Sequence, residues 1–150
     1  MDIKCILIDD ERLARDVVKT YIADYENISI VAECKNGFEG IKAIQELKPD
    51  LVFLDIQMPK INGFEMLELL EDPPAIIFTT AFDQYAIKAF EINAVDYLLK
   101  PFSKDRFNEA VSRMASRISS GQVPKQNLNN LQKDFDETKE YLNRVIIKDK

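Results

Sequence analysis

The 150-residue chain contains no histidine at all. This absence removes the commonest general base and metal ligand, so Ser-His-Asp triads, Cys-His dyads and histidine-based zinc sites are excluded. Any chemistry that the chain performs must therefore use carboxylates, lysines and hydroxyls.

Cysteine is scarce, because only Cys5 and Cys34 occur. Each lies inside an apolar run, IKCILI for the first and ISIVAEC for the second. A cysteine in such a run usually behaves as a small buried hydrophobic residue. We assign no chemistry to either thiol.

Long apolar runs are also missing. No run reaches the roughly 18 apolar residues that a membrane-spanning helix needs. The first segment, MDIKCILIDD, lacks the long apolar stretch and the small-residue cleavage site of a signal peptide. We therefore expect a soluble, cytoplasmic protein with no membrane partner.

Positive charge is in deficit, with 20 basic and 26 acidic residues and a net charge of −6. Residues 1–120 carry 14 of the basic and 21 of the acidic side chains, so the acidity lies in that part of the chain. Nucleic-acid affinity depends on Lys and Arg that displace counterions from phosphates. These 150 residues are not expected to bind DNA by themselves.

Five short runs rich in Ile, Val, Leu and Phe alternate with segments of helical periodicity. Near-continuous apolar runs are typical of strands buried on both faces in a parallel sheet. The alternation predicts an α/β fold, a doubly wound (βα)5 sandwich around a five-stranded parallel sheet. The predicted strands are 3–8, 28–34, 51–55, 75–79 and 96–100, and the predicted helices are 11–24, 38–47, 64–71, 84–92 and 104–118.

The composition changes near residue 120, where Gly121 and Pro124 punctuate a polar stretch. We expect a domain at 1–120 and a linker at 121–150. The linker carries a heptad-like apolar stripe with one polar interruption, which leaves two interpretations: a helix that packs on a partner, or a mobile solvated segment. The stripe consists of Leu128, Leu131, Phe135, Leu142 and Val145.

Polar residues follow four of the predicted strands. In an open parallel sheet, ligands bind outside the carboxyl ends of the strands. Crowded carboxylates there favour a hard divalent cation such as Mg²⁺, and a phosphoryl group on one of them would be stabilised by the metal, an ammonium and a hydroxyl. The strand ends carry Asp9-Asp10, Asp55, Thr79-Thr80-Ala81 and Lys100-Pro101.

Each of these residues also has an ordinary structural interpretation. Asp10 could cap the helix that begins ERLARDVV, and Asp55 could be a loop acid. Thr80 could be a strand-edge residue, and Lys100 a solvated charge. The joint occurrence at four strand ends favours the functional hypothesis.

The sequence resembles response regulator receiver domains from residue 3 to about 118, and four motifs in order carry this resemblance: IDDE, FLDIQMPKINGFE, FTTAF and VDYLLKPF. The segments LDIQMPKINGFEML and FTTAFDQYAIKAFEINAVDYLLKPF are similar in sequence to receivers of the LytTR (LytR/AlgR) group, in which a receiver precedes a mostly β DNA-binding domain. The resemblance implies the CheY-like, flavodoxin-like strand order 2-1-3-4-5.

The resemblance also implies roles for the residues of the site. Asp55 is expected as the phosphoacceptor and Lys100 as a contact of the phosphoryl group, with a cis bond to Pro101. The implied Mg²⁺ ligands are Asp9, Asp10, Asp55 and the backbone carbonyl of Gln57.

Two further residues match the switch of the family. Thr80, which precedes the small Ala81, matches the switch hydroxyl. The neighbouring Thr79 also carries a hydroxyl but does not match this position. Ala81 would contact the phosphoryl group through its backbone. Tyr97 matches the aromatic that rotates with the hydroxyl, although it could instead be an ordinary strand aromatic at the edge of the core.

The implied partners are a sensor histidine kinase, a second copy of the chain on phosphorylation, and DNA through a domain missing from these residues. The last residues, RVIIKDK, resemble the opening of a LytTR domain, which would make the chain a truncated one. A stand-alone receiver that signals through protein–protein interaction remains an alternative. No enzymatic activity is expected beyond phosphotransfer to the chain itself and autodephosphorylation.

An enzyme of the haloacid-dehalogenase type, with an aspartyl-phosphate intermediate, is a third class. Such enzymes carry a second Asp two residues after the nucleophile. Here Asp55 is followed by Ile56 and Gln57, so this reading is weaker.

Overall fold

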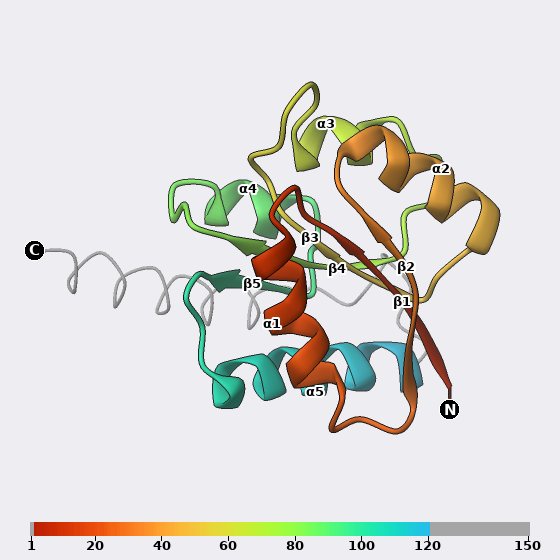
Figure 1. Ribbon diagram of the computed structural model, residues 1–150, viewed down its shortest axis with the longest axis vertical. Helices are drawn as coiled ribbons and strands as arrows, with labels where there is room; N and C mark the ends of the chain where they lie inside the picture. Colours follow the sequence, from red (N-terminus) through yellow and green to blue (C-terminus); the bar gives the residue numbers. More distant parts are fainter. Residues whose placement is uncertain (1, 121–150) are drawn as a thin grey trace, which may run out of the picture.

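The computed structural model describes residues 2–120, so the predicted linker at 121–150 and its apolar stripe lie outside the described residues. Strands and helices alternate along the described chain (Figure 1). The strands are β1 (Ile3–Ile8), β2 (Ile28–Cys34), β3 (Leu51–Leu54), β4 (Ala75–Thr80) and β5 (Asp96–Leu99). The helices are α1 (Arg12–Ile22), α2 (Gly37–Leu47), α3 (Gly63–Glu68), α4 (Ala86–Glu91) and α5 (Lys104–Ser119).

The five strands form one parallel sheet in the order β2-β1-β3-β4-β5. This order confirms the predicted doubly wound fold. The chain starts near the middle of the sheet, adds β2 on one side and then crosses to the other side for β3. The connections that follow β1 and β3 therefore diverge, and in doubly wound sheets ligands bind at the carboxyl ends of such strands.

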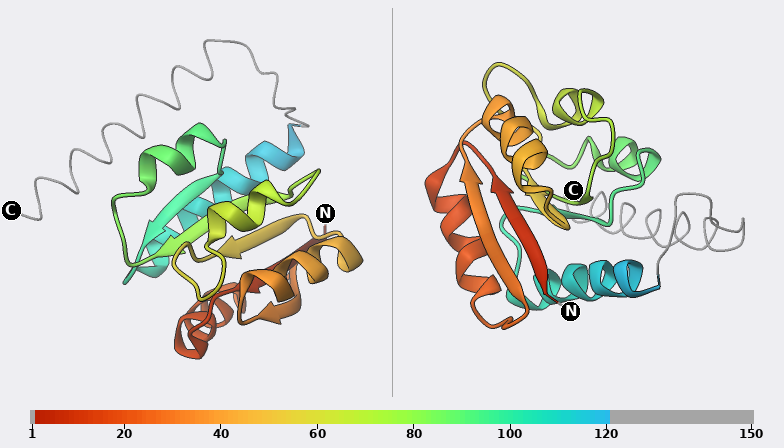
Figure 2. Two further views of the ribbon diagram at one scale, coloured as in Figure 1. Left: turned by 90° about the horizontal axis from the view of Figure 1, so that it is seen from above. Right: turned by 90° about the vertical axis from the view of Figure 1, so that its right-hand side faces the viewer.

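Helices cover both faces of the sheet. The two helices α1 and α5 lie on one face, and α2, α3 and α4 lie on the other (Figure 1). Seen from above, α5 lies across the far side of the sheet beneath β4 and β5 (Figure 2). On β3, Leu51 and Phe53 point to the α1/α5 side, while Val52 and Leu54 point to the other side, so the strand is apolar on both faces.

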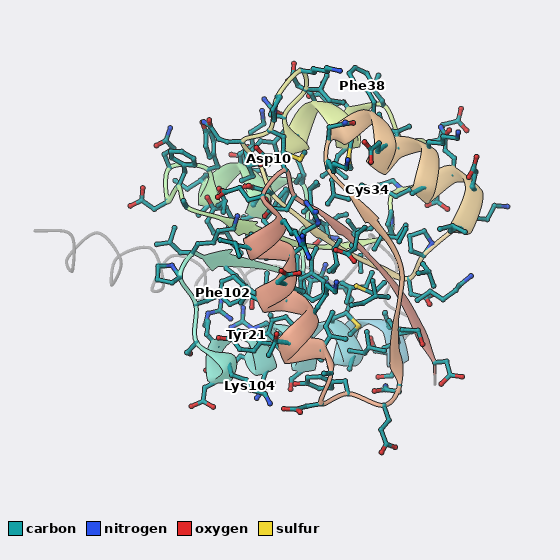
Figure 3. All side chains as sticks on the ribbon, viewed as in Figure 1. Asp10, Tyr21, Cys34, Phe38, Phe102 and Lys104 are labelled. Atoms are coloured by element: carbon teal, nitrogen blue, oxygen red, sulfur yellow. The ribbon has the colours of Figure 1, made fainter. Side chains whose placement is uncertain are left out.

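Aromatic rings fill the α1/α5 side of the core. The rings of Phe53 and Phe107 stack with centroids 5.3 Å apart, and Phe102 stacks on the same Phe107 ring at 6.3 Å. Tyr21 on α1 meets Phe102 edge-on at 6.0 Å and donates a hydrogen bond from its hydroxyl to the Phe102 carbonyl at 3.3 Å (Figure 3). These contacts fix the segment between β5 and α5 against α1.

Helix starts follow the predicted loop chemistry. The side chain of Asn62 accepts a hydrogen bond from the Glu65 backbone N–H, and the Glu65 side chain accepts one from the Asn62 N–H, which makes a complete capping box. The side chains of Asn36 and Ser103 likewise accept a hydrogen bond from the backbone N–H three residues later, at the starts of α2 and α5. The capping residues thus set where α2, α3 and α5 begin.

Three helices are shorter than the sequence predicts, and α1 is one of them, since it spans Arg12–Ile22 and not 11–24. The predicted helix at 64–71 ends as α3 at Glu68, and the one at 84–92 spans only Ala86–Glu91. Pro73 disfavours helical backbone at Asp72, so it sets only an outer limit for α3, which ends four residues earlier at Glu68. Asn93 adopts a left-handed conformation (φ 65°), and this ends α4.

Within residues 2–120, no helix is long and apolar enough to cross a membrane. The longest, α5, has 16 residues and an apolar face that packs on the sheet. The five helices of the described part form the two layers that cover the faces of the sheet.

Both cysteines should be unreactive in the folded protein. Burial, with a smaller contribution from the charge of Glu39, raises the pKa of Cys34 to about 11, and burial also raises the pKa of Cys5. The thiolate is the reactive form, so at about pH 8 only roughly one Cys34 thiol in a thousand would be ionised. Mass spectrometry after iodoacetamide treatment should show no modification of the native protein and double modification in denaturant; rapid native labelling would contradict the buried placement.

Candidate functional site

The site lies at the carboxyl ends of β1, β3, β4 and β5. Asp9 follows β1 and Asp55 follows β3, while Thr80 ends β4 and Lys100 follows β5. The register of the parallel strands aligns these ends, as the sequence predicts. Four residues that are up to 91 positions apart in the chain therefore share one edge of the sheet.

The Lys100 ammonium contacts two carboxylates. Its Nζ lies 2.7 Å from Oδ2 of Asp9 and 3.3 Å from Oδ2 of Asp55. The exposed fractions of the side chains are 19% for Lys100, 6% for Asp9 and 7% for Asp55. The three groups are largely shielded from water, so their mutual attraction is stronger than that of a surface pair. The interpretation of Lys100 as a solvated charge is therefore wrong.

A cluster of four acidic residues surrounds this contact. One carboxylate oxygen from each of Asp9, Asp10, Glu11 and Asp55 lies within 4.8 Å of the others. Hard oxygen donors at this spacing fit Mg²⁺, which prefers carboxylates and retained waters. Asp9 and Asp55 are buried, whereas Asp10 and Glu11 are exposed, so a metal here would be open to solvent on one side.

Glu11 is a member of the cluster that the sequence analysis did not single out. It follows the acidic pair directly in the IDDE motif, and that adjacency is the signal that could have found it. Glu11, and not Asp10, is the N-cap residue of α1, and it makes no side-chain capping bond. The capping interpretation of Asp10 is therefore wrong.

Burial raises the pKa of Asp55 above the ordinary value of an aspartate, and the nearby charge of Asp9 adds to this effect. The Lys100 ammonium and the Ile56 backbone N–H lower the pKa and offset part of the rise. The ionised form of Asp55 is thus less stable in the folded chain than in water, and an added cation nearby would offset that cost.

Burial by itself would lower the pKa of Lys100. The hydrogen bond to Asp9 and the charges of Asp55 and Asp9 outweigh that effect, so the pKa is raised overall. Lys100 therefore stays protonated at neutral pH and presents a fixed positive charge to the two carboxylates.

Backbone contacts hold Asp55 in place. Its Oδ1 accepts a hydrogen bond from the Ile56 N–H at 2.7 Å, and its own N–H donates to the Ile8 carbonyl at 2.9 Å. Gly63, at the start of α3, approaches so closely that a Cβ there would lie 2.6 Å from the Asp55 carbonyl oxygen. Only glycine fits at this position without a backbone shift.

Two of the predicted contacts come from exposed residues. Gln57 lies two residues after Asp55, and its side chain donates from Nε2 to the Tyr85 hydroxyl at 2.7 Å. Ala81 follows β4 directly. The expected metal contact of the Gln57 carbonyl and phosphoryl contact of the Ala81 backbone stay predictions, as does the Lys100 role, although the Lys100–Pro101 peptide bond is cis as the resemblance implies.

Thr80 and Tyr97 both contact the backbone of Phe82. The sequence did not predict either contact. Thr80 is fully buried, and its Oγ1 accepts a hydrogen bond from the Phe82 N–H at 3.4 Å. The Tyr97 hydroxyl donates to the Phe82 carbonyl, and its ring packs beside Phe78 at 6.3 Å. Tyr97 thus points inward, and both the switch interpretation and the core-edge interpretation fit this placement.

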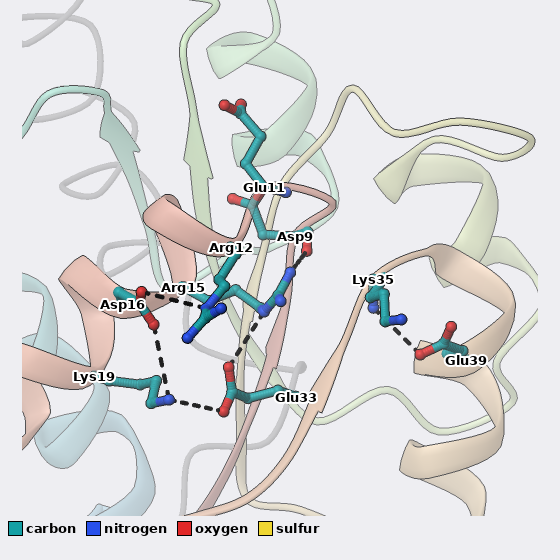
Figure 4. Close-up of polar contacts among 9 residues, drawn as sticks. All are labelled: Asp9, Glu11, Arg12, Arg15, Asp16, Lys19, Glu33, Lys35 and Glu39. Atoms are coloured by element: carbon teal, nitrogen blue, oxygen red, sulfur yellow. Dashed lines mark hydrogen bonds and ion pairs between the residues drawn. The ribbon is translucent and has the colours of Figure 1, made fainter.

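Arg15 was also missed by the sequence analysis. Its Nη1 donates to the backbone carbonyl of Asp9 at 2.6 Å, and its Nε lies 3.2 Å from Oε1 of Glu33 on β2 (Figure 4). The sequence offered only an arginine on a helical face, which is usually solvated. The contact depends on α1 lying beside the ends of β1 and β2, which the tertiary fold decides.

The chain resembles many known proteins. It is 48% identical over 123 residues to the transcriptional regulatory protein BtsR of Escherichia coli K12, which covers 81% of this chain and 52% of BtsR. It is also 48% identical over 114 residues to an uncharacterized response regulatory protein of Vibrio cholerae, covering 75% of this chain and 48% of that protein. The chain thus spans about half the length of these curated relatives.

Solved structures show the same fold. The response regulatory domain of protein mrkE from Klebsiella pneumoniae superposes with a TM-score of 0.72 at 30% identity, covering 78% of this chain and 98% of that one. The REC domain of AraT, a response regulator from Geobacillus stearothermophilus, gives 0.74 at 27% identity, with 82% and 100% covered. Residues 5–112 match the family described as response regulator receiver domain, and the chain belongs to this family.

Proposed function

We propose that Asp55 is the phosphoacceptor of a two-component response regulator and that a sensor histidine kinase phosphorylates it. The observation that carries this proposal is the Lys100 ammonium between the buried carboxylates of Asp9 and Asp55. A fixed cation beside a destabilised carboxylate suits a reaction in which phosphoryl oxygens bring negative charge to that point.

The transfer forms a bond between phosphorus and a carboxylate oxygen of Asp55. The bond between phosphorus and the imidazole nitrogen of the kinase phosphohistidine breaks, and the imidazole leaves with the electron pair. Lys100 stabilises the negative charge on the phosphoryl oxygens. Burial of Asp55 limits the access of water, while the hydrogen bond from Ile56 orients the carboxylate.

The residues that would hold Mg²⁺ are Asp9, Asp10, Asp55 and the backbone carbonyl of Gln57. Glu11 belongs to the same acidic cluster and is a further candidate, directly or through a water. When bound, Mg²⁺ neutralises the crowded carboxylates and draws charge from the phosphoryl oxygens. Asp9 and Asp55 would both link the metal to the lysine, because each carboxylate belongs to the cluster and also contacts Lys100.

Thr80 and Tyr97 form the proposed switch. Thr80 leaves Phe82 to hydrogen-bond the phosphoryl group, and Tyr97 moves into the vacated space. This movement changes the face made by α4, β5 and α5, where Ile87 is exposed, and that face then pairs two copies of the chain.

The output is proposed to be transcription control. The chain matches about half the length of BtsR, a transcriptional regulatory protein, which supports a role in transcription control. The LytTR-like motifs of the sequence are the reason for proposing that the output is a LytTR-type DNA-binding domain beyond residue 150, in a cytoplasmic regulator. The alternative is a receiver that signals only by protein–protein interaction. The coding sequence downstream of Lys150 separates the two, because only the first requires a second domain.

Asp55→Asn should abolish labelling by a small acyl phosphate with Mg²⁺, measured as the gain of one phosphoryl group in intact mass. The folded-state pKa of Asp55 lies above its unfolded value, so ionisation of Asp55 costs stability once the pH rises through that range. The neutral amide should therefore leave the Tm at neutral pH unchanged or raised. Asp72→Asn, at an exposed position, is the matched control and should label normally; equal labelling of both variants would contradict the acceptor assignment.

Asp10→Ala should raise the Mg²⁺ concentration needed for half-maximal phosphorylation, on the order of tenfold or more, because a charged oxygen ligand is lost. The rate at saturating Mg²⁺ should recover at least in part, since Asp55 and Lys100 are untouched. Titration of the labelling rate against Mg²⁺ tests this. An unchanged midpoint would remove Asp10 from the metal site.

Thr80→Ala should separate phosphorylation from dimerisation. The variant is expected to accept a phosphoryl group but to remain monomeric in size-exclusion chromatography with light scattering, whereas the beryllofluoride-treated wild type becomes a dimer. Thr79→Ala removes the neighbouring, similarly buried hydroxyl and should still dimerise. Dimerisation of Thr80→Ala at the wild-type level would show that this hydroxyl is not the switch.

A further inference from the structure

Arg15 joins the acidic loop of Asp9, Asp10 and Glu11 to β2. Its guanidinium is well shielded, with 11% of the side chain exposed. It donates from Nη1 to the Asp9 carbonyl at 2.6 Å and pairs through Nε with Glu33 at 3.2 Å (Figure 4). Two nitrogens of one rigid planar group are therefore used for two different partners, a geometry that lysine cannot reproduce.

Glu33 supplies the fixed end of this contact. It lies on β2 and is also paired with Lys19, whose Nζ is 3.1 Å from its Oε2. Burial alone would raise the pKa of Glu33, but hydrogen bonds and charges from Lys19 and Arg15 lower it overall, so the carboxylate is ionised at neutral pH. The positive charge of Arg15 is therefore compensated locally by Glu33.

The peptide unit that Arg15 holds lies between the first two acidic residues of the cluster. The side chain of Asp9 is fixed by Lys100 and by the Glu11 N–H at 2.9 Å. Asp10 is exposed, and within residues 2–120 its side chain makes no hydrogen bond to orient it. The position of the Asp10 carboxylate thus depends on its backbone, and the Asp9 carbonyl is the point where a side chain restrains that backbone.

We propose that Arg15 is a positioning residue that sets the Mg²⁺ affinity of the Asp9-Asp10-Glu11 loop. The inference rests on the proposed metal site. Residues that orient metal ligands without touching the metal typically change affinity 10- to 100-fold when they are removed. Arg15 is placed to act in this way, because it contacts the Asp9 carbonyl and is itself held by Glu33.

A direct charge effect would act in the opposite sense. A nearby cation repels Mg²⁺, so loss of an arginine through charge alone should tighten metal binding. Arg12 offers a matched control on the same helix, because its side chain is 85% exposed and its ion pair with Asp16 is long, at 3.8 Å. Arg12→Ala removes the same charge and leaves the Arg15 contact with the Asp9 carbonyl in place, so the two variants separate positioning from charge.

The test is isothermal titration calorimetry of Mg²⁺ into the full chain and its variants, with the Tm measured alongside. Arg15→Ala should raise the Kd for Mg²⁺ about tenfold. Arg12→Ala should leave it within about twofold, because an exposed charge is screened by salt. Arg15→Lys should lose affinity nearly as much as Arg15→Ala, since it keeps the charge but cannot make both contacts.

Glu33→Gln provides an independent check from the other end of the contact. It should weaken Mg²⁺ binding in the same direction, and the Arg15→Ala/Glu33→Gln double variant should be no weaker than the worse single variant, because both act through one contact. In labelling by acyl phosphate, the variants should need more Mg²⁺ yet approach the wild-type rate at saturation.

The outcomes are distinguishable. If the wild type binds no Mg²⁺, the proposed metal site fails, whatever Arg15 does. If the wild type binds Mg²⁺ and the folded Arg15→Ala variant has the same or a lower Kd, the positioning role is overturned. Should Arg15→Ala lower the Tm enough to unfold the chain, Arg15→Lys and Glu33→Gln decide, and a wild-type Kd in both would overturn the proposal.

Discussion

The arrangement of this domain centres on a largely shielded ammonium, that of Lys100, between two buried carboxylates. Asp9 and Asp55 repel each other at the edge of the sheet, and Lys100 lies 2.7 Å and 3.3 Å from them. Removing such charges from water is costly and is repaid only with good geometry. The parallel sheet provides that geometry, because it brings the ends of β1, β3 and β5 to one edge.

The same lysine connects the acidic site to Thr80 and, through Phe82, to Tyr97. The Lys100 backbone N–H donates to the Thr80 carbonyl at 2.7 Å, so the two strand ends that carry the cation and the hydroxyl are hydrogen-bonded neighbours. Thr80 in turn contacts Phe82, which also receives the Tyr97 hydroxyl. Asp55 is thus connected to the Tyr97 ring on β5 through four contacts, by way of Lys100, Thr80 and Phe82. Packed groups of this kind shift between discrete arrangements and do not deform continuously.

Two kinds of restraint act on the acidic loop. Lys100 holds the Asp9 side chain from the interior, and Arg15 holds the Asp9 carbonyl from α1. In the proposed phosphotransfer, the first restraint would also place an ammonium beside the phosphoryl charge. The second is mechanical, because the charge of Arg15 is already balanced by Glu33 on β2.

The sequence by itself determined the fold class, the strand order through its resemblance, and the strand ends that carry Asp9, Asp55, Thr80 and Lys100. These follow from local patterns, since buried strands read as apolar runs and their polar ends stand out. Only the tertiary structure decided the contacts of Arg15, the meeting of Thr80 and Tyr97 at Phe82, and the early ends of α3 and α4. Such contacts join elements far apart in the chain. The local sequence around an arginine, a carbonyl or a helix end does not indicate which partner the packing will place beside it.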